Sequence, residues 1–281
     1  KHNRQRFRLE PTGDLVLAQW NVTSIPGKDT ARFLCDGDAR FFFGLERKTV
    51  LARYPDPAPV LAYNILARDG DIAIEQKSFA VPLERSISDD RLASDDTIVA
   101  MVRFRFQNLG DTPAVAELPL SYSNQSSRSH NAYAVDRQDD YLVPRGARDA
   151  LIVDGNILRS EWKGQKPLRA RWKGTLQPET QGEQIVFRQT LQPGEVGELL
   201  LKIPYIAVDQ PHELQALQAL SFEACYPEVT AFWREQGRQG AQLACPEPHL
   251  TALHASHLSH VLVTDCTMPD GSGLINTSVG T

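Results

Sequence analysis

Long apolar runs are missing from this sequence of 281 residues. No stretch of eighteen consecutive apolar residues occurs, so we expect no transmembrane helix and no membrane partner. Basic residues are also not in excess, because 30 Lys and Arg stand against 35 Asp and Glu and give a formal net charge of -5. Nucleic-acid binding usually requires a basic surface stripe, so we expect no nucleic-acid partner.

Cysteine is scarce as well. The four cysteines, Cys35, Cys225, Cys245 and Cys266, have no regular spacing and form no C-x-x-C pair. They cannot provide a disulfide framework for a chain of this length, so we expect free or buried thiols. The first residues, KHNRQRFRLE, lack the apolar core of a signal peptide. The sequence leaves the compartment open, with the cytoplasm favoured over secretion.

The pattern of apolar, polar and turn residues predicts a β fold up to about Val208. The composition, 41% hydrophobic and 23% charged, is typical of a globular protein. In VRFRFQ, Val102, Phe104 and Phe106 alternate with polar residues, which is the period of a half-buried antiparallel strand. Similar segments follow one another, separated by Gly, Pro and Asp turns. We therefore predict a mainly β fold in which residues 1–208 form a large antiparallel β-sandwich.

Beyond this segment the pattern becomes helical. Asp209 can cap a helix in which Leu214, Leu217 and Leu220 recur at three-residue spacing. The segment YPEVTAFWREQGRQG predicts a second helix. Residues 209–245 are therefore expected to form a helical linker.

Four of the seven histidines lie in a third predicted helix, from about Pro246 to Val263; they are His249, His254, His257 and His260. A metal site needs three or four converging ligands, and the H-E-x-x-H pattern is absent. Leucines and a valine lie on the same side of the predicted helix as the histidines, which is typical of a buried helix. We expect packed or hydrogen-bonded imidazoles in a helical core, with no metal and no other cofactor. A structural metal and a polar contact at a substrate pocket are the alternatives.

The order of these parts resembles a known plan. A β-sandwich is followed by a linker with FWREQG, by CPEPHL at the start of a long helix, and by a glycine-rich loop. This resembles the N-terminal part of glycoside hydrolases and phosphorylases in which linker helices join a large β-sandwich to an (α/α)6 six-hairpin barrel. The resemblance is carried by residues 226–281 and, more weakly, by VRFRFQNLGDTPAVAELPLSYS. It implies that residues 246–281 begin a truncated (α/α)6 barrel.

The resemblance also implies a substrate and partners. The substrate would be an oligo- or polysaccharide, and the missing C-terminal barrel would be the main partner; a homodimer is left open. In enzymes of this plan the catalytic carboxyl groups lie deeper in the barrel, so no catalytic residue is assigned here and the chain alone is expected to be inactive. The loop after the third helix would contribute one wall of the substrate cleft through Asp270, Asn276, Thr277 and Ser278.

The C-terminal residues, DGSGLINTSVGT, contain no helix or strand pattern that would close a fold, so we interpret the chain as part of a longer protein. Hydrolysis and phosphorolysis remain equally open. The alternative from another class is a noncatalytic β-sandwich module that binds carbohydrate or mediates assembly.

Three further features could contact sugar or an ion. The tryptophans offer flat apolar faces on which sugar rings stack; they are Trp20, Trp162, Trp172 and Trp233. For Trp162 and Trp172 a hairpin with core or edge aromatics is the favoured interpretation. The polar loop 123–140 is long, and long ordered loops are often functional. The segment SDDRLASDD, residues 88–96, reads as a solvated loop between strands, with a cation-binding loop as the alternative.

Overall fold

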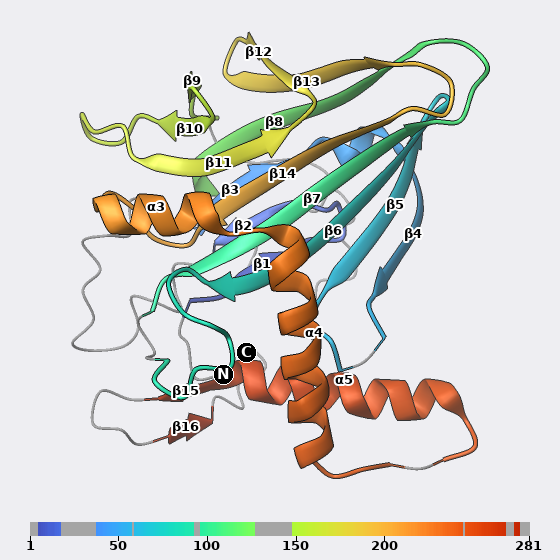
Figure 1. Cartoon of the computed structure of the whole chain (residues 1–281), viewed down its shortest axis with the longest axis vertical. Coiled ribbons are helices and arrows are strands. Elements are labelled where there is room, and N and C mark those ends of the chain that lie inside the picture. Colours follow the sequence, from blue (N-terminus) through green and yellow to red (C-terminus); the bar gives the residue numbers. More distant parts are fainter. Residues whose placement is uncertain are drawn as a thin grey trace.

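The computed structural model describes residues 5–17, 38–57, 59–92, 96–126, 148–243, 245–267 and 273–275. For residues 38, 125–126, 260–267 and 273–275 it describes the backbone alone. The fold is mainly β, as predicted: two large antiparallel sheets face each other, and three helices follow them in the chain (Figure 1).

The first sheet has six strands in the order β1 (Phe7–Leu9), β2 (Leu15–Leu17), β3 (Asp38–Phe42), β8 (Ala114–Ser126), β13 (Gln184–Leu191) and β12 (Gln177–Gln181). The second has eight strands in the order β4 (Thr49–Pro55), β5 (Tyr63–Asp69), β6 (Ile72–Pro82), β7 (Ile98–Asn108), β14 (Val196–Pro204), β11 (Leu168–Gly174), β10 (Ile157–Ser160) and β9 (Leu151–Asp154). A short 3-10 helix, η1 (Leu45–Arg47), connects β3 to β4. The neighbouring strands are antiparallel throughout the described part of both sheets.

The connections that cross between the sheets include two adjacent ones, from β7 to β8 and from β13 to β14. After β7 the chain thus passes to the other sheet and does not turn back in a hairpin. The fully buried Asn108, at the end of β7, ties the two crossings together. Its side-chain amide donates hydrogen bonds to the carbonyl oxygens of Thr112, at 2.8 Å, and Leu191, at 3.0 Å.

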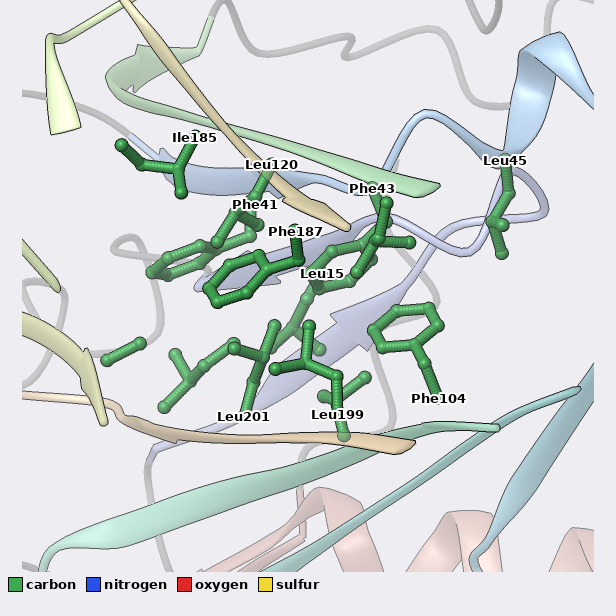
Figure 2. Close-up of a cluster of buried hydrophobic side chains, with 14 of the residues drawn as sticks. Leu15, Phe41, Phe43, Leu45, Phe104, Leu120, Ile185, Phe187, Leu199 and Leu201 are labelled. Carbon is green, nitrogen blue, oxygen red and sulfur yellow. The ribbon is translucent and has the colours of Figure 1, made fainter. Parts of the chain in front are cut away.

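The main core lies between the sheets. The alternation read in VRFRFQ is confirmed, because Val102, Phe104 and Phe106 are all fully buried in it. Figure 2 shows Phe41 and Phe187 of the six-stranded sheet pointing toward leucines of β14 on the opposite sheet. Each fully buried aliphatic or aromatic side chain contributes about 1.5–3 kcal/mol relative to exposure, so this layer is the main source of stability.

Three helices follow the sandwich: α3 (Pro211–Ala219), α4 (Phe222–Gln239) and α5 (Pro248–Thr264). The prediction that Asp209 caps the first of them is wrong by one residue, because Gln210 is the N-cap. The buried carboxylate of Glu213 accepts the backbone N–H of Gln210 at 3.3 Å, which fixes the helix start there. No helix in the described residues is both long and apolar enough to cross a bilayer.

The α4 helix packs on the outer face of the eight-stranded sheet, and α5 crosses α4 below that sheet (Figure 1). A second hydrophobic cluster lies between this sheet and α4. It contains Phe79 of β6 and Met101 of β7, together with Phe222 and Trp233 of α4. The rings of Phe79 and Phe222 meet edge to face, 5.0 Å apart. The sheet is thus buried on both faces where the helices cover it.

After α5 the sequence predicted a glycine-rich connection. The structure has instead a small antiparallel hairpin, β15 (Asp265–Thr267) and β16 (Gly273–Ile275).

Candidate functional site

The four residues predicted to line a substrate cleft, Asp270, Asn276, Thr277 and Ser278, lie outside the described residues. In the sequence, Asp270 falls between β15 and β16, and the other three follow β16. Their proposed contacts with sugar hydroxyls therefore stay predictions.

The histidine helix, α5, differs from its prediction. The imidazoles of His249 and His257 are exposed and that of His254 is half-buried, so these three are not packed in a helical core. Leu250 and Leu253 are 51% and 55% exposed. Within the described part of the chain, no group of three or more His, Cys, Asp or Glu side chains is close enough to hold a metal ion. The side chain of His260 is outside the described set, so the metal prediction stays a prediction.

Two of the described tryptophans are packed against other aromatic rings. Trp172 of β11 meets Phe187 edge to face at 5.2 Å, and Trp233 of α4, which is 6% exposed, meets Phe232 edge to face at 5.2 Å. Trp162 forms a bridge with Gln165 in the turn between β10 and β11, where the ammonium of Lys163 lies 4.6 Å from its ring centroid. The hairpin predicted here is confirmed, Trp233 offers no free face, and Trp172 is partly buried against the main core. Trp20 lies outside the described residues.

The acidic segment 88–96 forms part of the connection between β6 and β7, as predicted. Its carboxylates pair with arginines: Asp89 accepts from Arg91 at 2.8 Å, and Asp96 lies 3.8 Å from Arg85. Asp95 is outside the described residues, as are residues 127–140 of the long polar loop; its first residues belong to β8. The cysteines Cys225 and Cys245 are free thiols, as expected.

A buried polar cluster joins α4 to the sandwich. The hydroxyl of Tyr226 on α4 donates to Asp56, whose other oxygen accepts from Asn64 at 2.7 Å. The ammonium of Lys77 on β6 donates to Asp56 and to the Tyr226 oxygen, both at 3.2 Å. Burial opposes the charge of Asp56, but these hydrogen bonds outweigh it and hold its pKa below the usual value. The cluster is fully paired, so its role is attachment.

Lys202 of β14, only 4% exposed, attaches α3 in a similar way. Its ammonium donates to the carbonyl oxygens of Leu217, at 3.0 Å, and Gln218, at 2.8 Å. These carbonyls belong to the last turn of α3, which lacks partners within the helix and carries the negative end of the helix dipole. Burial lowers the pKa of Lys202 to about 8, with the charges of Arg171 and Lys173 acting in the same direction.

A third contact holds α5. The hydroxyl of the buried Ser259 donates to the carbonyl oxygen of Pro59 at 2.7 Å. The ring of Pro59 also lies against Gly237 of α4, where an added Cβ would come within 2.5 Å of it. The connection between β4 and β5 therefore holds both α4 and α5.

The outer face of the six-stranded sheet carries an open hollow of about 280 Å³. It is lined by residues of β3, η1 and β8, by residue 148, and by the turn between β12 and β13. The polar and aromatic lining residues include Phe42, Glu46, Arg47, Arg148, Glu183 and Gln184. Phe42 points outward because its neighbour Phe41 fills the core. Gly44, at φ 66°, starts η1 against Pro119, where an added Cβ would approach the proline ring to 2.5 Å. This close approach places Glu46 at the hollow.

Charged groups around the hollow are partly buried. The guanidinium carbon of Arg148 lies 3.3 Å from the ring centroid of Phe42. Burial lowers the pKa of Arg148, and the nearby charge of Asp14 opposes this effect. Asp14 itself is 4% exposed and accepts the backbone N–H of Phe43 at 3.0 Å. Burial raises its pKa to about 6. The hydrogen bond from Phe43 lowers this pKa, and the charge of Glu46 raises it further.

Sequence reasoning missed both the hollow and the attachment clusters. Their residues lie far apart in the chain: Asp56 and Tyr226 are 170 positions apart, and the lining of the hollow runs from residue 42 to residue 184. The one local signal was a polar or charged residue directly beside an apolar run, such as Asp14 before the strand Leu15–Leu17. That signal also marks ordinary strand ends.

Comparisons with known proteins give little further guidance. No model of a protein family matches the sequence, and no curated protein matches it significantly. Among solved structures, the chain is similar to one described as "Putative kojibiose phosphorylase from human microbiome", with 9% sequence identity and a TM-score of 0.40. The match covers 94% of this chain and 43% of that chain, so this chain spans less than half the length of that protein. A likeness this loose assigns neither family nor substrate.

Proposed function

We propose that the chain is the N-terminal region of a carbohydrate-active enzyme, a glycoside hydrolase or phosphorylase. In this proposal residues 1–208 are a supporting β-sandwich, residues 209–245 a helical linker and residues 246–281 the start of an (α/α)6 barrel. The loop after α5, with Asp270, Asn276, Thr277 and Ser278, would form one wall of the substrate cleft. The substrate would be an oligo- or polysaccharide.

One observation carries the proposal: the helices are fixed to the sandwich by buried or partly buried polar contacts. Separate contacts attach α3 through Lys202, α4 through Tyr226 and α5 through Ser259. An independent binding module is normally joined to its neighbours by an exposed, flexible linker with few contacts. Here the linker itself is part of the packed structure, as is needed when a sandwich must position a helical domain.

The surface of α5 supports the same proposal. Leu250 and Leu253, three residues apart, lie on neighbouring positions of the helix and are both more than half exposed. A pair of exposed leucines on one helix face favours burial against another apolar surface. In the proposed enzyme, further helices of the barrel would cover them.

Catalysis is assigned to the barrel, not to the sandwich. Glycoside cleavage requires two carboxyl groups about 5–10 Å apart on either side of the scissile bond. Four acidic residues are buried among those that the structure describes, and each has a structural partner: Asp56 pairs with Tyr226 and Lys77, Asp14 with the backbone of Phe43, Glu10 with Arg8, and Glu213 with the backbone of Gln210.

The experiment compares the 281-residue chain with the product of its complete reading frame on a panel of α- and β-linked glucosides, with and without inorganic phosphate. The short chain should release no sugar, and the complete product should release free sugar or sugar phosphate. Release by the short chain, abolished by a single Asp or Glu substitution within it, would overturn the proposal. So would a complete reading frame without further helical hairpins, which would favour the binding or assembly module instead.

A further inference from the structure

The hollow on the six-stranded sheet contains buried polar atoms that the protein leaves unpaired. In the described part of the chain, Glu46 Oε2 and Arg148 Nη1 are buried and have no hydrogen-bond partner. A buried polar atom without a partner costs about 1–3 kcal/mol, so two beside one hollow need an explanation. A ligand that donates to the carboxylate and accepts from the guanidinium would satisfy both once a small rotation of each side chain turns these covered atoms toward the hollow.

The charge of the lining indicates what kind of ligand fits. Two arginines, Arg47 and Arg148, are balanced by two glutamates, Glu46 and Glu183. An anion such as phosphate would be attracted by the arginines but repelled by both carboxylates. A cation would be attracted by the carboxylates but repelled by both arginines. A neutral ligand incurs neither repulsion.

The hydrogen-bonding groups narrow the choice further. The lining offers an acceptor in Glu46, donors in Arg148, and groups of both kinds in Ser121, Gln181 and Gln184. A hydroxyl group both donates and accepts, so adjacent hydroxyls on one ring can pair with a carboxylate and a guanidinium together. The volume of about 280 Å³ is near the lower end of small-molecule pockets, which run from about 300 to 1,000 Å³.

We propose that this hollow binds a neutral saccharide of one or two sugar units, held by Glu46 and Arg148. The site lies on the outer face of the six-stranded sheet, whereas α4 covers the outer face of the eight-stranded sheet. It is therefore separate from the cleft proposed after α5. The choice of a saccharide among neutral polyols rests on the proposed function, whereas the existence of a site for a neutral polyhydroxyl ligand rests on the hollow alone.

Binding can be measured on the 281-residue chain by ligand-observed NMR and isothermal titration calorimetry. The probes are glucose, maltose, cellobiose and kojibiose, with myo-inositol as a non-saccharide polyol and glucose 1-phosphate as an anion. At least one neutral saccharide should bind at millimolar concentration or better. Glucose 1-phosphate should bind more weakly than glucose, because the carboxylates repel it.

Two substitutions test the assigned residues. Glu46→Gln keeps the size of the side chain but removes the charge, and Arg148→Met removes the guanidinium; each should weaken binding at least tenfold. The matched control is Arg105→Met with Glu198→Gln, a half-exposed pair 3.7 Å apart on the eight-stranded sheet, which should leave binding unchanged. Circular dichroism and a thermal melt establish that each variant is folded.

Three outcomes would overturn the proposal. These are no binding of any neutral saccharide, binding that survives both Glu46→Gln and Arg148→Met, and binding of myo-inositol alone. Because the measurement involves no sugar release, its failure leaves the proposed role in an enzyme untouched. Conversely, an inactive complete reading frame would not affect a measured affinity at this hollow.

Discussion

The ammonium group of Lys202 donates a hydrogen bond to the carbonyl oxygen of Leu217 at 3.0 Å, across the gap between β14 and the last turn of α3. A lysine on the outer face of a strand would normally extend into water. Here the chain folds a helix end over it, and the positive charge meets the negative end of the helix dipole. The contact joins the last strand of the sandwich to the first helix that follows.

This arrangement predicts a pH dependence of stability. Burial lowers the pKa of Lys202 to about 8 from a normal value of 10.5, so the unfolded state holds the proton more tightly than the folded state. The free energy of unfolding should therefore rise with pH between about 8 and 10.5, by up to about 3 kcal/mol, and should not change through this group below about pH 8, where both states hold the proton. Urea denaturation across this range measures the rise.

The variant Lys202→Met should lose this rise, while Lys166→Met, at an exposed position in the turn between β10 and β11, should retain it. Equal pH dependence in the unchanged protein and in Lys202→Met would contradict the assignment.

Asp14 predicts an effect of opposite sign at lower pH. Burial raises its pKa to about 6 from 3.8, so the folded state holds the proton more tightly. The stabilisation is present below about pH 4 and is lost as pH rises through 6, which amounts to about 3 kcal/mol. Asp14→Asn should abolish this loss, because the amide does not titrate, and its oxygen can still accept the N–H of Phe43. Denaturation at pH 4 to 7 measures it, with the exposed Asp111→Asn as a control that should behave like the unchanged protein.

Removing the Tyr226 hydroxyl should loosen α4. Tyr226→Phe deletes the hydrogen bonds to Asp56 and Lys77 while keeping the ring, and should cost about 1–3 kcal/mol of unfolding free energy. Hydrogen exchange followed by mass spectrometry should show faster exchange in α4, with β7 and β13 unchanged. Tyr54→Phe, at an exposed position on β4, is the matched control and should have no effect. Unchanged exchange in α4 would show that the apolar contacts alone hold it.

The sandwich core should respond much more strongly than its surface. Phe104 is fully buried and meets Phe43 at 5.1 Å between ring centroids, so Phe104→Ala should lower the free energy of unfolding by about 3–5 kcal/mol. Leu109→Ala, at a site 53% exposed in the turn after β7, should stay within about 0.5 kcal/mol of the unchanged protein. Chemical denaturation compares the two. A loss below about 1 kcal/mol for Phe104→Ala would place the main core elsewhere.

The strands were predictable where one side of the strand faces water. Alternation of apolar and polar residues is a local property, and it correctly marked β7. The burial of α5 was not predictable in the same way. Its residues are apolar or small nearly all round, which indicates a buried helix, yet the structure leaves Leu250 and Leu253 exposed. Periodicity reports which residues a helix could bury, and only the neighbours decide which it does bury.

The sequence by itself determined the β-sandwich, the change from strands to helices after residue 208, and the positions of most turns. These depend on side-chain period and on Gly and Pro, which act within a few residues. Only the tertiary structure decided that strands on either side of a turn separate into different sheets, that Lys202 and Tyr226 attach the helices, and that Glu46 and Arg148 meet at one hollow. Such pairings join residues distant in the chain, and their energies depend on burial and on partners that no local pattern specifies.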